Sequence, residues 1–219
     1  AVEMPEIKGT VDFDHVTFSY EDGIPILKDV SFHVDQGQTI AIVGPTGAGK
    51  TTIVNLLSRF YNTDSGCVRI DGQDISKVTL HSLRTQMGVM MQDSFIFSGT
   101  IMDNIRYGNK TATDEEVIRA AKTVRAHDFI MQMEDGYQTQ VNERGSRLSV
   151  GQRQLISFAR ALLNDPAILI LDEATSSIDT ETEIALQKGL DELLKGRTSF
   201  IIAHRLSTIQ GEYHHIILY

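Results

Sequence analysis

Several features are scarce in this 219-residue chain, and each absence narrows its class. The single cysteine, Cys67, excludes an internal disulfide and suits a reducing compartment. No apolar run approaches the roughly 20 residues that cross a bilayer, and no signal peptide opens the chain. A formal net charge of −9 without a long basic block argues against binding to nucleic acid or to an anionic membrane. The start at Ala1 rather than Met is expected to be a boundary inside a longer protein.

The hydrophobic content of 41% is enough for one sizeable core or a core with a smaller lobe. Residues 11–20 alternate apolar and polar side chains and slip phase once near His15, which predicts a strand with a β-bulge. Residues 30–34 alternate in the same way. The runs 167–171 and 199–203 are apolar on both faces, which is typical of strands buried in a parallel sheet.

A glycine-rich loop follows another apolar run, residues 39–43, and precedes a helix-like run. Residues 44–51, Gly-Pro-Thr-Gly-Ala-Gly-Lys-Thr, match the phosphate-binding pattern G-x-x-x-x-G-K-[ST]. Its glycines let backbone N–H groups converge on an anion, aided by the positive end of the next helix. Lys50 can reach the outer phosphates, and the Thr51 hydroxyl can ligate Mg²⁺. The alternative, an ordinary Gly-rich turn, does not explain strand, loop and helix in this order. We expect a nucleoside triphosphate to bind here, at Gly44, Pro45, Thr46, Gly47, Ala48, Gly49, Lys50, Thr51 and Thr52.

Two adjacent carboxylates, Asp172 and Glu173, end the second buried strand pattern. Ligands of open parallel sheets bind beyond the carboxyl ends of the strands. In a chain that also has a phosphate loop, we expect Asp172 to hold Mg²⁺ through water and Glu173 to face an attacking water. Without that loop, the same pair could be a solvated turn.

The segment Leu148–Gln152 opens a predicted helix over residues 153–163. Ser149 with Gln152 three residues later reads as a capping box. A helix start that contains Gly151 can also bind an anion through its free N–H groups. Both interpretations are compatible, and neither is excluded at this point.

Taken in order, these motifs resemble the nucleotide-binding domain of an exporter-type ATP-binding cassette (ABC) transporter over nearly the whole chain. Residues 148–152 match the family signature, usually L-S-G-G-Q, with Val150 as a departure. The resemblance implies that Ser149, Gly151 and Gln152 bind the γ-phosphate of ATP held by an opposite domain. It also implies a P-loop NTPase fold.

The expected architecture is α/β, with a mostly parallel sheet, an N-terminal antiparallel β lobe and an inserted α-helical subdomain. The core and β lobe cover residues 1–93 and 150–219. Residues 94–150 lack a strong strand pattern and are expected to be helical, with a capping box at 113–116 opening one helix. A further helix is expected over residues 180–194.

The resemblance also assigns roles to single residues. Tyr20 matches the aromatic residue that stacks on adenine, and Gln92 the glutamine that touches Mg²⁺ and the attacking water. His204 matches the switch histidine, which orients Glu173 and the γ-phosphate. Residues 176–179 match a loop at the dimer seam, and residues 140–145 resemble an exporter-specific loop, with Asn142 where glycine is common. Each of these residues, taken alone, has a plainer reading as a core or surface side chain.

The implied activity is ATP hydrolysis with Mg²⁺, catalysed by Glu173, His204, Gln92 and Lys50. The implied partners are a second nucleotide-binding domain, either identical or homologous, and the transmembrane domain of the same transporter, at the cytoplasmic face of a membrane. Two alternatives stay open: a soluble ABC-type ATPase, and a regulatory half without turnover. The acidic balance and the exporter-like residues 97–105 oppose the first alternative, and the presence of Glu173 and His204 opposes the second.

The carboxyl end departs from the family pattern, because only nine residues follow Gln210. Residues 216–218 could form a final strand. However, Tyr213, Ile216 and Ile217 share a helical face. Residues 211–213, Gly-Glu-Tyr, also resemble the opening of the family's final helix. We therefore expect a helix over 212–218 and a missing segment of roughly twenty to thirty residues between Gln210 and Gly211. A continuous chain that leads into a strand would refute both expectations.

Overall fold

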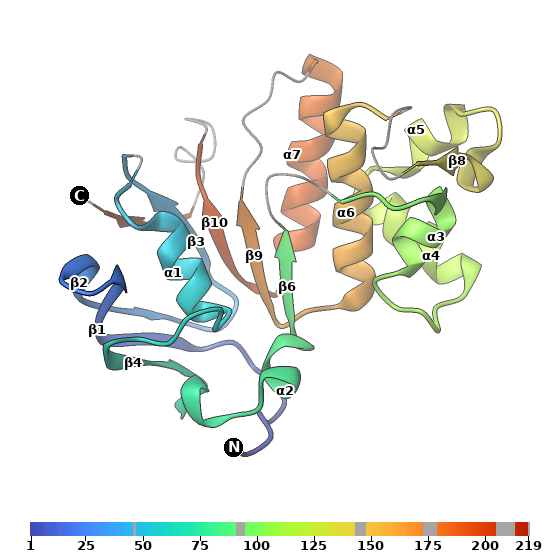
Figure 1. Ribbon diagram of the computed structural model, residues 1–219. Helices are drawn as coiled ribbons and strands as arrows, with labels where there is room; N and C mark the ends of the chain where they lie inside the picture. The colour runs from blue at the N-terminus through green and yellow to red at the C-terminus, as the bar shows by residue number, and fades with distance from the viewer. Residues whose placement is uncertain (46, 91–94, 143–147, 173–178, 205–212, 219) are drawn as a thin grey trace. The chain divides into compact units, whose positions relative to one another are not determined.

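The computed structural model describes residues 1–45, 47–90, 95–142, 148–172, 179–204 and 213–218. The chain divides into two compact units, each built from segments far apart in sequence (Figure 1). The first unit comprises Ala1–Val89, Pro166–Glu173 and Gly196–Tyr219. The second comprises Met90–Asp165 and Ala174–Lys195.

The first unit opens with an antiparallel sheet that confirms the expected β lobe. Its order is β2-β1-β4-β5, from strands β1 (Val11–Glu21), β2 (Ile24–Val34), β4 (Ser65–Ile70) and β5 (Gln73–Asp74). The register between β1 and β2 shifts after Phe13, and His15 adopts a positive φ of 48°. The strand is therefore irregular near His15, where the slip in the apolar pattern predicts a β-bulge.

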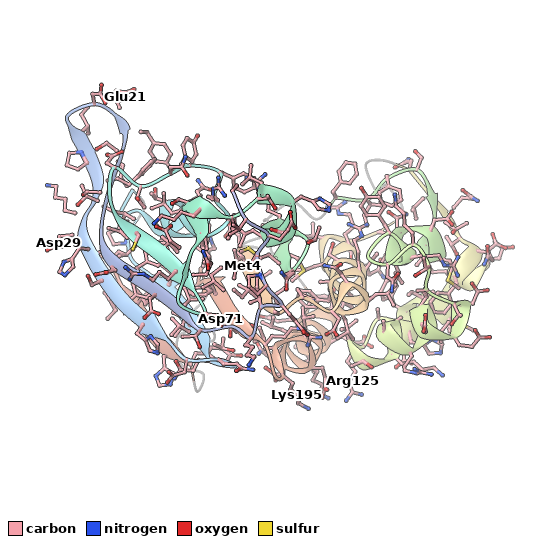
Figure 2. The ribbon with its side chains drawn as sticks, turned by 90° about the horizontal axis from the view of Figure 1, so that it is seen from below. Met4, Glu21, Asp29, Asp71, Arg125 and Lys195 are labelled. Carbon is pink, nitrogen blue, oxygen red and sulfur yellow. The ribbon has the colours of Figure 1, made fainter. Side chains whose placement is uncertain are left out.

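The N-terminal segment is tied to this sheet through Asp71, which follows β4. The Asp71 carboxylate accepts the backbone amides of Lys8, Gly9 and Thr10 at 2.6, 3.0 and 2.9 Å. In Figure 2, Asp71 lies beside the N-terminal chain, while Glu21 marks the far tip of the β1–β2 hairpin. The lobe is thus fixed at its base and exposed at its tip.

A second sheet in this unit has the order β11-β3-β10-β9-β6. Its strands are β3 (Thr39–Val43), β6 (Met87–Met90), β9 (Ile168–Asp172), β10 (Thr198–Ile202) and β11 (His214–Ile217). The pairs β11–β3, β3–β10 and β10–β9 are all parallel. The two runs that are apolar on both faces therefore form adjacent inner strands, and Ile170 and Phe200 are fully buried.

The expected C-terminal helix is wrong, because residues 214–217 form strand β11. His214–Ile217 pair in parallel with Ile40–Val43, and the Leu218 amide donates to the Val43 carbonyl at 2.9 Å. The apolar spacing fits a short strand as well as a helix, and the open edge of β3 supplies the hydrogen bonds that decide the outcome. The proposed gap between Gln210 and Gly211 falls outside the described residues.

Helices complete the first unit. They are α1 (Lys50–Leu57), a 3₁₀ turn (Ile75–Lys77) and α2 (Leu80–Arg84). Ile53, Val54, Leu56 and Leu57 of α1 are all buried in the same hydrophobic core as the inner strands. This packing anchors the helix whose first residue, Lys50, belongs to the glycine-rich loop.

The second unit is mainly helical. Its helices are α3 (Ile101–Arg106), α4 (Asp114–Thr123), α5 (His127–Gln132), α6 (Val150–Asn164) and α7 (Thr180–Leu194), with a 3₁₀ turn at Gly136–Gln138. The capping box predicted at 113–116 is present on α4. The expectation that residues 94–150 contain only helices needs a correction, because β7 (Gly99–Thr100) and β8 (Gln140–Val141) form a small antiparallel ladder.

The contacts of α6 show why it groups with the helical unit rather than with the sheet. The Arg160 guanidinium donates to the backbone oxygens of Phe95 and Asn104 at 2.9 and 2.8 Å and lies 5.3 Å from the centre of the Phe97 ring. A Cβ on Gly108 would lie 2.1 Å from the Arg160 carbonyl oxygen, so the backbones approach closely here. The predicted domain division, with a helical subdomain over residues 94–150, stays a prediction.

Among the residues that the structure describes, no helix is both long enough and apolar enough to span a membrane.

Candidate nucleotide site

The glycine-rich loop occupies the turn between β3 and α1, as its sequence position requires (Figure 1). Gly47 and Gly49 have φ values of +84° and +97°, a backbone conformation that residues with a Cβ rarely adopt. The Ala48 amide donates to the Pro45 carbonyl at 3.1 Å, which closes a tight turn. Gly49 caps α1 without a side-chain bond, so the first N–H groups of the helix have no capping side chain.

Lys50 lies back over this loop. Its Nζ donates to the Gly44 carbonyl oxygen at 2.5 Å. This bond joins the ammonium group of Lys50 to the first residue of the loop. Thr51 is exposed and Thr52 is buried, so the two consecutive hydroxyls face different surroundings.

Two predicted site residues meet at the carboxyl edge of the parallel sheet. Asp172 is the last residue of β9, and His204 follows the end of β10 by two residues. His204 Nε2 lies 2.8 Å from Asp172 Oδ1, and their side chains are 25% and 12% exposed. An ionised carboxylate can only accept, so Nε2 carries the proton of this bond. Since β10 lies between β9 and β3, this pair is on the same edge as the glycine-rich loop.

The predicted adenine-stacking residue, Tyr20, is near the end of β1 and is 45% exposed. Its hydroxyl oxygen lies 3.1 Å from Thr52 Oγ1 and accepts from Asn55 Nδ2 at 3.2 Å. The Tyr61 ring contacts it at a centroid distance of 4.9 Å and an interplanar angle of 88°. Tyr20 is thus attached to the helix that follows the phosphate loop.

Asn55 and Tyr61 also belong to this cluster, although neither residue is part of a predicted motif. The i, i+3 spacing of Thr52 and Asn55 on one predicted helix was the available signal. This spacing alone does not predict the cluster, because Tyr20 comes from a strand more than 30 residues earlier in the chain.

The predicted signature residues belong to the second unit, at the start of α6. Ser149 Oγ accepts the Gln152 amide, and Gln152 Oε1 accepts the Ser149 amide, both at 3.1 Å. The capping-box interpretation is therefore confirmed. Gly151 is buried in the first turn, and Val150 is the first helical residue.

The chemistry of the donors suits Mg²⁺. Thr51 offers a hydroxyl and Asp172 a carboxylate, both hard oxygen ligands, and Mg²⁺ typically uses one or two carboxylates together with substrate phosphates and water. In the described part of the chain, no three His, Cys, Asp or Glu side chains gather into a metal-binding group.

Several predicted residues fall outside the described ranges. They are Thr46, Gln92, Glu173 and residues 176–178 and 143–145. Asp179 is described and caps α7, accepting the Thr182 amide at 2.9 Å, and this bond lowers the pKa of Asp179. Asn142 directly follows β8.

Residues 27–176 match the ABC transporter family. The chain is 56% identical, over all of its length, to an uncharacterised ABC transporter ATP-binding protein, YknV, of Bacillus subtilis. It is 50% identical over 99% of its length to a fatty acid ABC transporter ATP-binding/permease protein of Mycobacterium bovis. Its fold matches a bacterial Atm1-family ABC exporter with ATP bound, with a TM-score of 0.90, 44% identity and full coverage of this chain.

The matches cover almost all of this chain but only about a third of each relative. The chain spans 36% and 34% of the two curated proteins and 38% of the chain in the solved structure. The shared part contains the phosphate loop, the Asp172 strand and the signature helix.

Proposed function

The chain belongs to the ABC transporter family, whose ATP-binding domains hydrolyse ATP to drive transport, and we propose that it powers export across a membrane by closing head-to-tail on a second such domain. The observation that carries this proposal is the shared carboxyl edge of β3, β10 and β9. It brings the phosphate loop, His204 and Asp172 together within one unit of the chain.

Nucleotide binding is assigned to the first unit. The loop from Gly44 to Thr51 surrounds the phosphates with backbone N–H groups, and Lys50 exchanges its bond to the Gly44 carbonyl for the outer phosphates. Tyr20 stacks on adenine through its exposed ring. When bound, Mg²⁺ neutralises charge on the phosphoryl oxygens, with Thr51, Asp172 and Gln92 as the residues that would hold it directly or through water.

Hydrolysis requires a water aligned with the γ-phosphate. We assign its alignment or deprotonation to Glu173, the residue after Asp172, a role worth about 10²–10⁴-fold in rate. The bond from His204 Nε2 to Asp172 supports a related role for the histidine. It fixes the ring at the carboxyl edge, from which it orients Glu173 and the γ-phosphate.

The signature is assigned to the partner's nucleotide. Ser149, Gly151 and Gln152 form a helix start. The capping box uses the backbone amides of Ser149 and Gln152, so the Gly151 amide in the first turn is the one that we assign to the phosphate. The cap bond uses the Ser149 oxygen as an acceptor and leaves its hydroxyl proton for a second partner. In this proposal, two chains enclose two nucleotides, each between the loop of one chain and the signature of the other.

The remaining partners are proposed from the Mycobacterium bovis relative, whose name gives it both an ATP-binding and a permease part. A transmembrane domain that contacts this chain at the cytoplasmic face of a membrane would set the cargo. Gln92 is assigned to couple ATP hydrolysis to that domain.

The rate of ATP hydrolysis per chain, measured over a wide range of protein concentration with Mg²⁺, tests the proposal. If two chains form the active unit, the specific rate rises with concentration until the dimer saturates. A constant, nonzero specific rate would refute the two-chain mechanism. No turnover at saturating concentration, in a chain that binds ATP, would favour the regulatory alternative. The Lys50→Ala variant is the control for contaminating ATPases.

A further inference from the structure

The ring of Tyr20 is held on several sides. Phe18 and Tyr61 contact it nearly edge-to-face, with centroid distances of 4.7 and 4.9 Å and interplanar angles of 88° in both pairs. Such ring pairs are favourable beyond the area that they bury. Tyr20 as a whole is nevertheless 45% exposed, so a ligand can reach the residue from solvent.

The hydroxyl of the same residue is fixed by two side chains of α1. Tyr20 Oη lies 3.1 Å from Thr52 Oγ1 and 3.2 Å from Asn55 Nδ2. Thr52 and Asn55 are three residues apart, so they share one face of the helix, and the phenol sits across both.

The donor directions of these two bonds are compatible. An amide nitrogen can only donate, so the phenol oxygen accepts from Asn55. The single phenol proton is then available for Thr52 Oγ1. Neither bond competes with the other, and together they restrain the ring at the end opposite its attachment to β1.

We propose that Asn55 is a positioning residue for base recognition, acting through the Tyr20 hydroxyl. The inference rests on the proposed function, in which Tyr20 stacks on adenine. Thr52 already lies in the predicted phosphate-loop set, whereas Asn55 is a full turn beyond Lys50, inside α1. Because α1 begins at the phosphate loop, the bond from Asn55 sets the position of the Tyr20 ring, on which the base would stack, relative to the loop that binds the phosphates.

This arrangement predicts a selective effect on the base. A ring that is fixed before binding costs less conformational entropy when the base stacks on it. In this scheme the phosphates have no contact with Asn55, and Tyr20 keeps its bond to Thr52 when the Asn55 amide is gone. Loss of Asn55 should therefore weaken binding of the base and leave phosphate binding unchanged.

The experiment compares ATP with inorganic tripolyphosphate, both with Mg²⁺, by calorimetric titration of the 219-residue chain. Asn55→Leu keeps a good helix former on α1 and removes the donor. It should weaken ATP binding about two- to tenfold, the range of one net hydrogen bond, and leave tripolyphosphate binding unchanged. Asn164→Leu, the same change at the exposed last residue of α6, is the matched control and should change neither.

A double-mutant cycle with Tyr20→Phe tests whether Asn55 acts through the hydroxyl. Tyr20→Phe keeps the ring and should weaken ATP binding on its own, and Asn55→Leu should then add little. Multiplicative effects of the two changes would overturn the proposal, as would an equal loss of ATP and tripolyphosphate binding in Asn55→Leu. A wild-type chain that binds ATP no better than tripolyphosphate would instead refute the stacking role of Tyr20 itself.

Discussion

Two glycines of the phosphate loop offer a matched pair of substitutions. Gly47 and Gly49 have similar positive φ values, +84° and +97°, but different surroundings. A Cβ on Gly47 would meet no atom within 4 Å. A Cβ on Gly49 would lie 2.8 Å from Leu27 Cδ2 and 3.3 Å from Ile26 Cγ2. Gly47→Ala therefore introduces backbone strain alone, and Gly49→Ala adds a steric clash.

The expected losses of unfolding free energy differ accordingly. A left-handed conformation costs a residue with a Cβ about 1–2 kcal/mol, which is the full expected effect of Gly47→Ala. Leu27 is only 2% exposed and lies in the core, so its displacement in Gly49→Ala adds an overpacking cost of about 1–3 kcal/mol. The second variant should then lose about 2–5 kcal/mol in total.

Urea unfolding of the wild type and both variants, followed by circular dichroism, measures these differences. The midpoints should fall in the order wild type, Gly47→Ala, Gly49→Ala, with similar slopes against denaturant. Equal midpoints for the two variants would refute the claim that the loop is packed against Leu27 and Ile26. A Gly47→Ala midpoint equal to that of the wild type would refute the strained backbone.

Three further predictions concern charge and capping. Lys50→Ala should lower ATP affinity by about tenfold or more, because a charge-assisted bond is lost, and titration with a fluorescent ATP analogue measures it. Ser149→Asp keeps a good helix cap but places a negative charge where the phosphate of the partner's ATP would bind, so it should abolish turnover. The thermal stability of the variant, and its ATP affinity measured at a low protein concentration at which the chain is monomeric, should stay unchanged. Hydrogen bonds to Asp12 and Asp35 raise the pKa of His33. The protonated His33 therefore stabilises the fold fully below its unfolded-state pKa of about 6.5, and this stabilisation is lost as the pH rises through the raised pKa of the folded state. The wild type should thus lose more stability than His33→Asn between about pH 6 and about pH 9, and parallel urea midpoints across that range would argue against the pairing.

Local sequence patterns were sufficient for the elements that carry the chemistry. The phosphate loop needs only its own glycines and the flanking strand and helix, and the buried strands ending at Asp172 and Ile202 are apolar on both faces. The capping boxes at Thr113 and Ser149 are equally local, because both partners lie within one turn. Such features depend on neighbours in the chain and can be predicted from it.

Elements decided by distant partners could not be predicted in this way. Strand β11 exists because β3 offers an open edge, and its four residues alone fit a helix equally well. Strands β7 and β8 have two residues each and no pattern, yet they pair across a separation of about 40 residues. The role inferred for Asn55, on helix α1, likewise depends on Tyr20, which lies on the distant strand β1. In each case the missing information is which distant segments meet.

The central claim is that two chains close around ATP before it is hydrolysed. Glu173→Gln removes the carboxylate assigned to the attacking water while it keeps the size of the side chain, so bound ATP should persist and hold the closed form. Light scattering of this variant on a size-exclusion column measures the mass directly, with Lys50→Ala in the same background as the control that cannot retain ATP. The account predicts twice the chain mass with ATP and Mg²⁺ and the single-chain mass without nucleotide. A single-chain mass for Glu173→Gln at saturating ATP, or turnover at the wild-type rate, would contradict it.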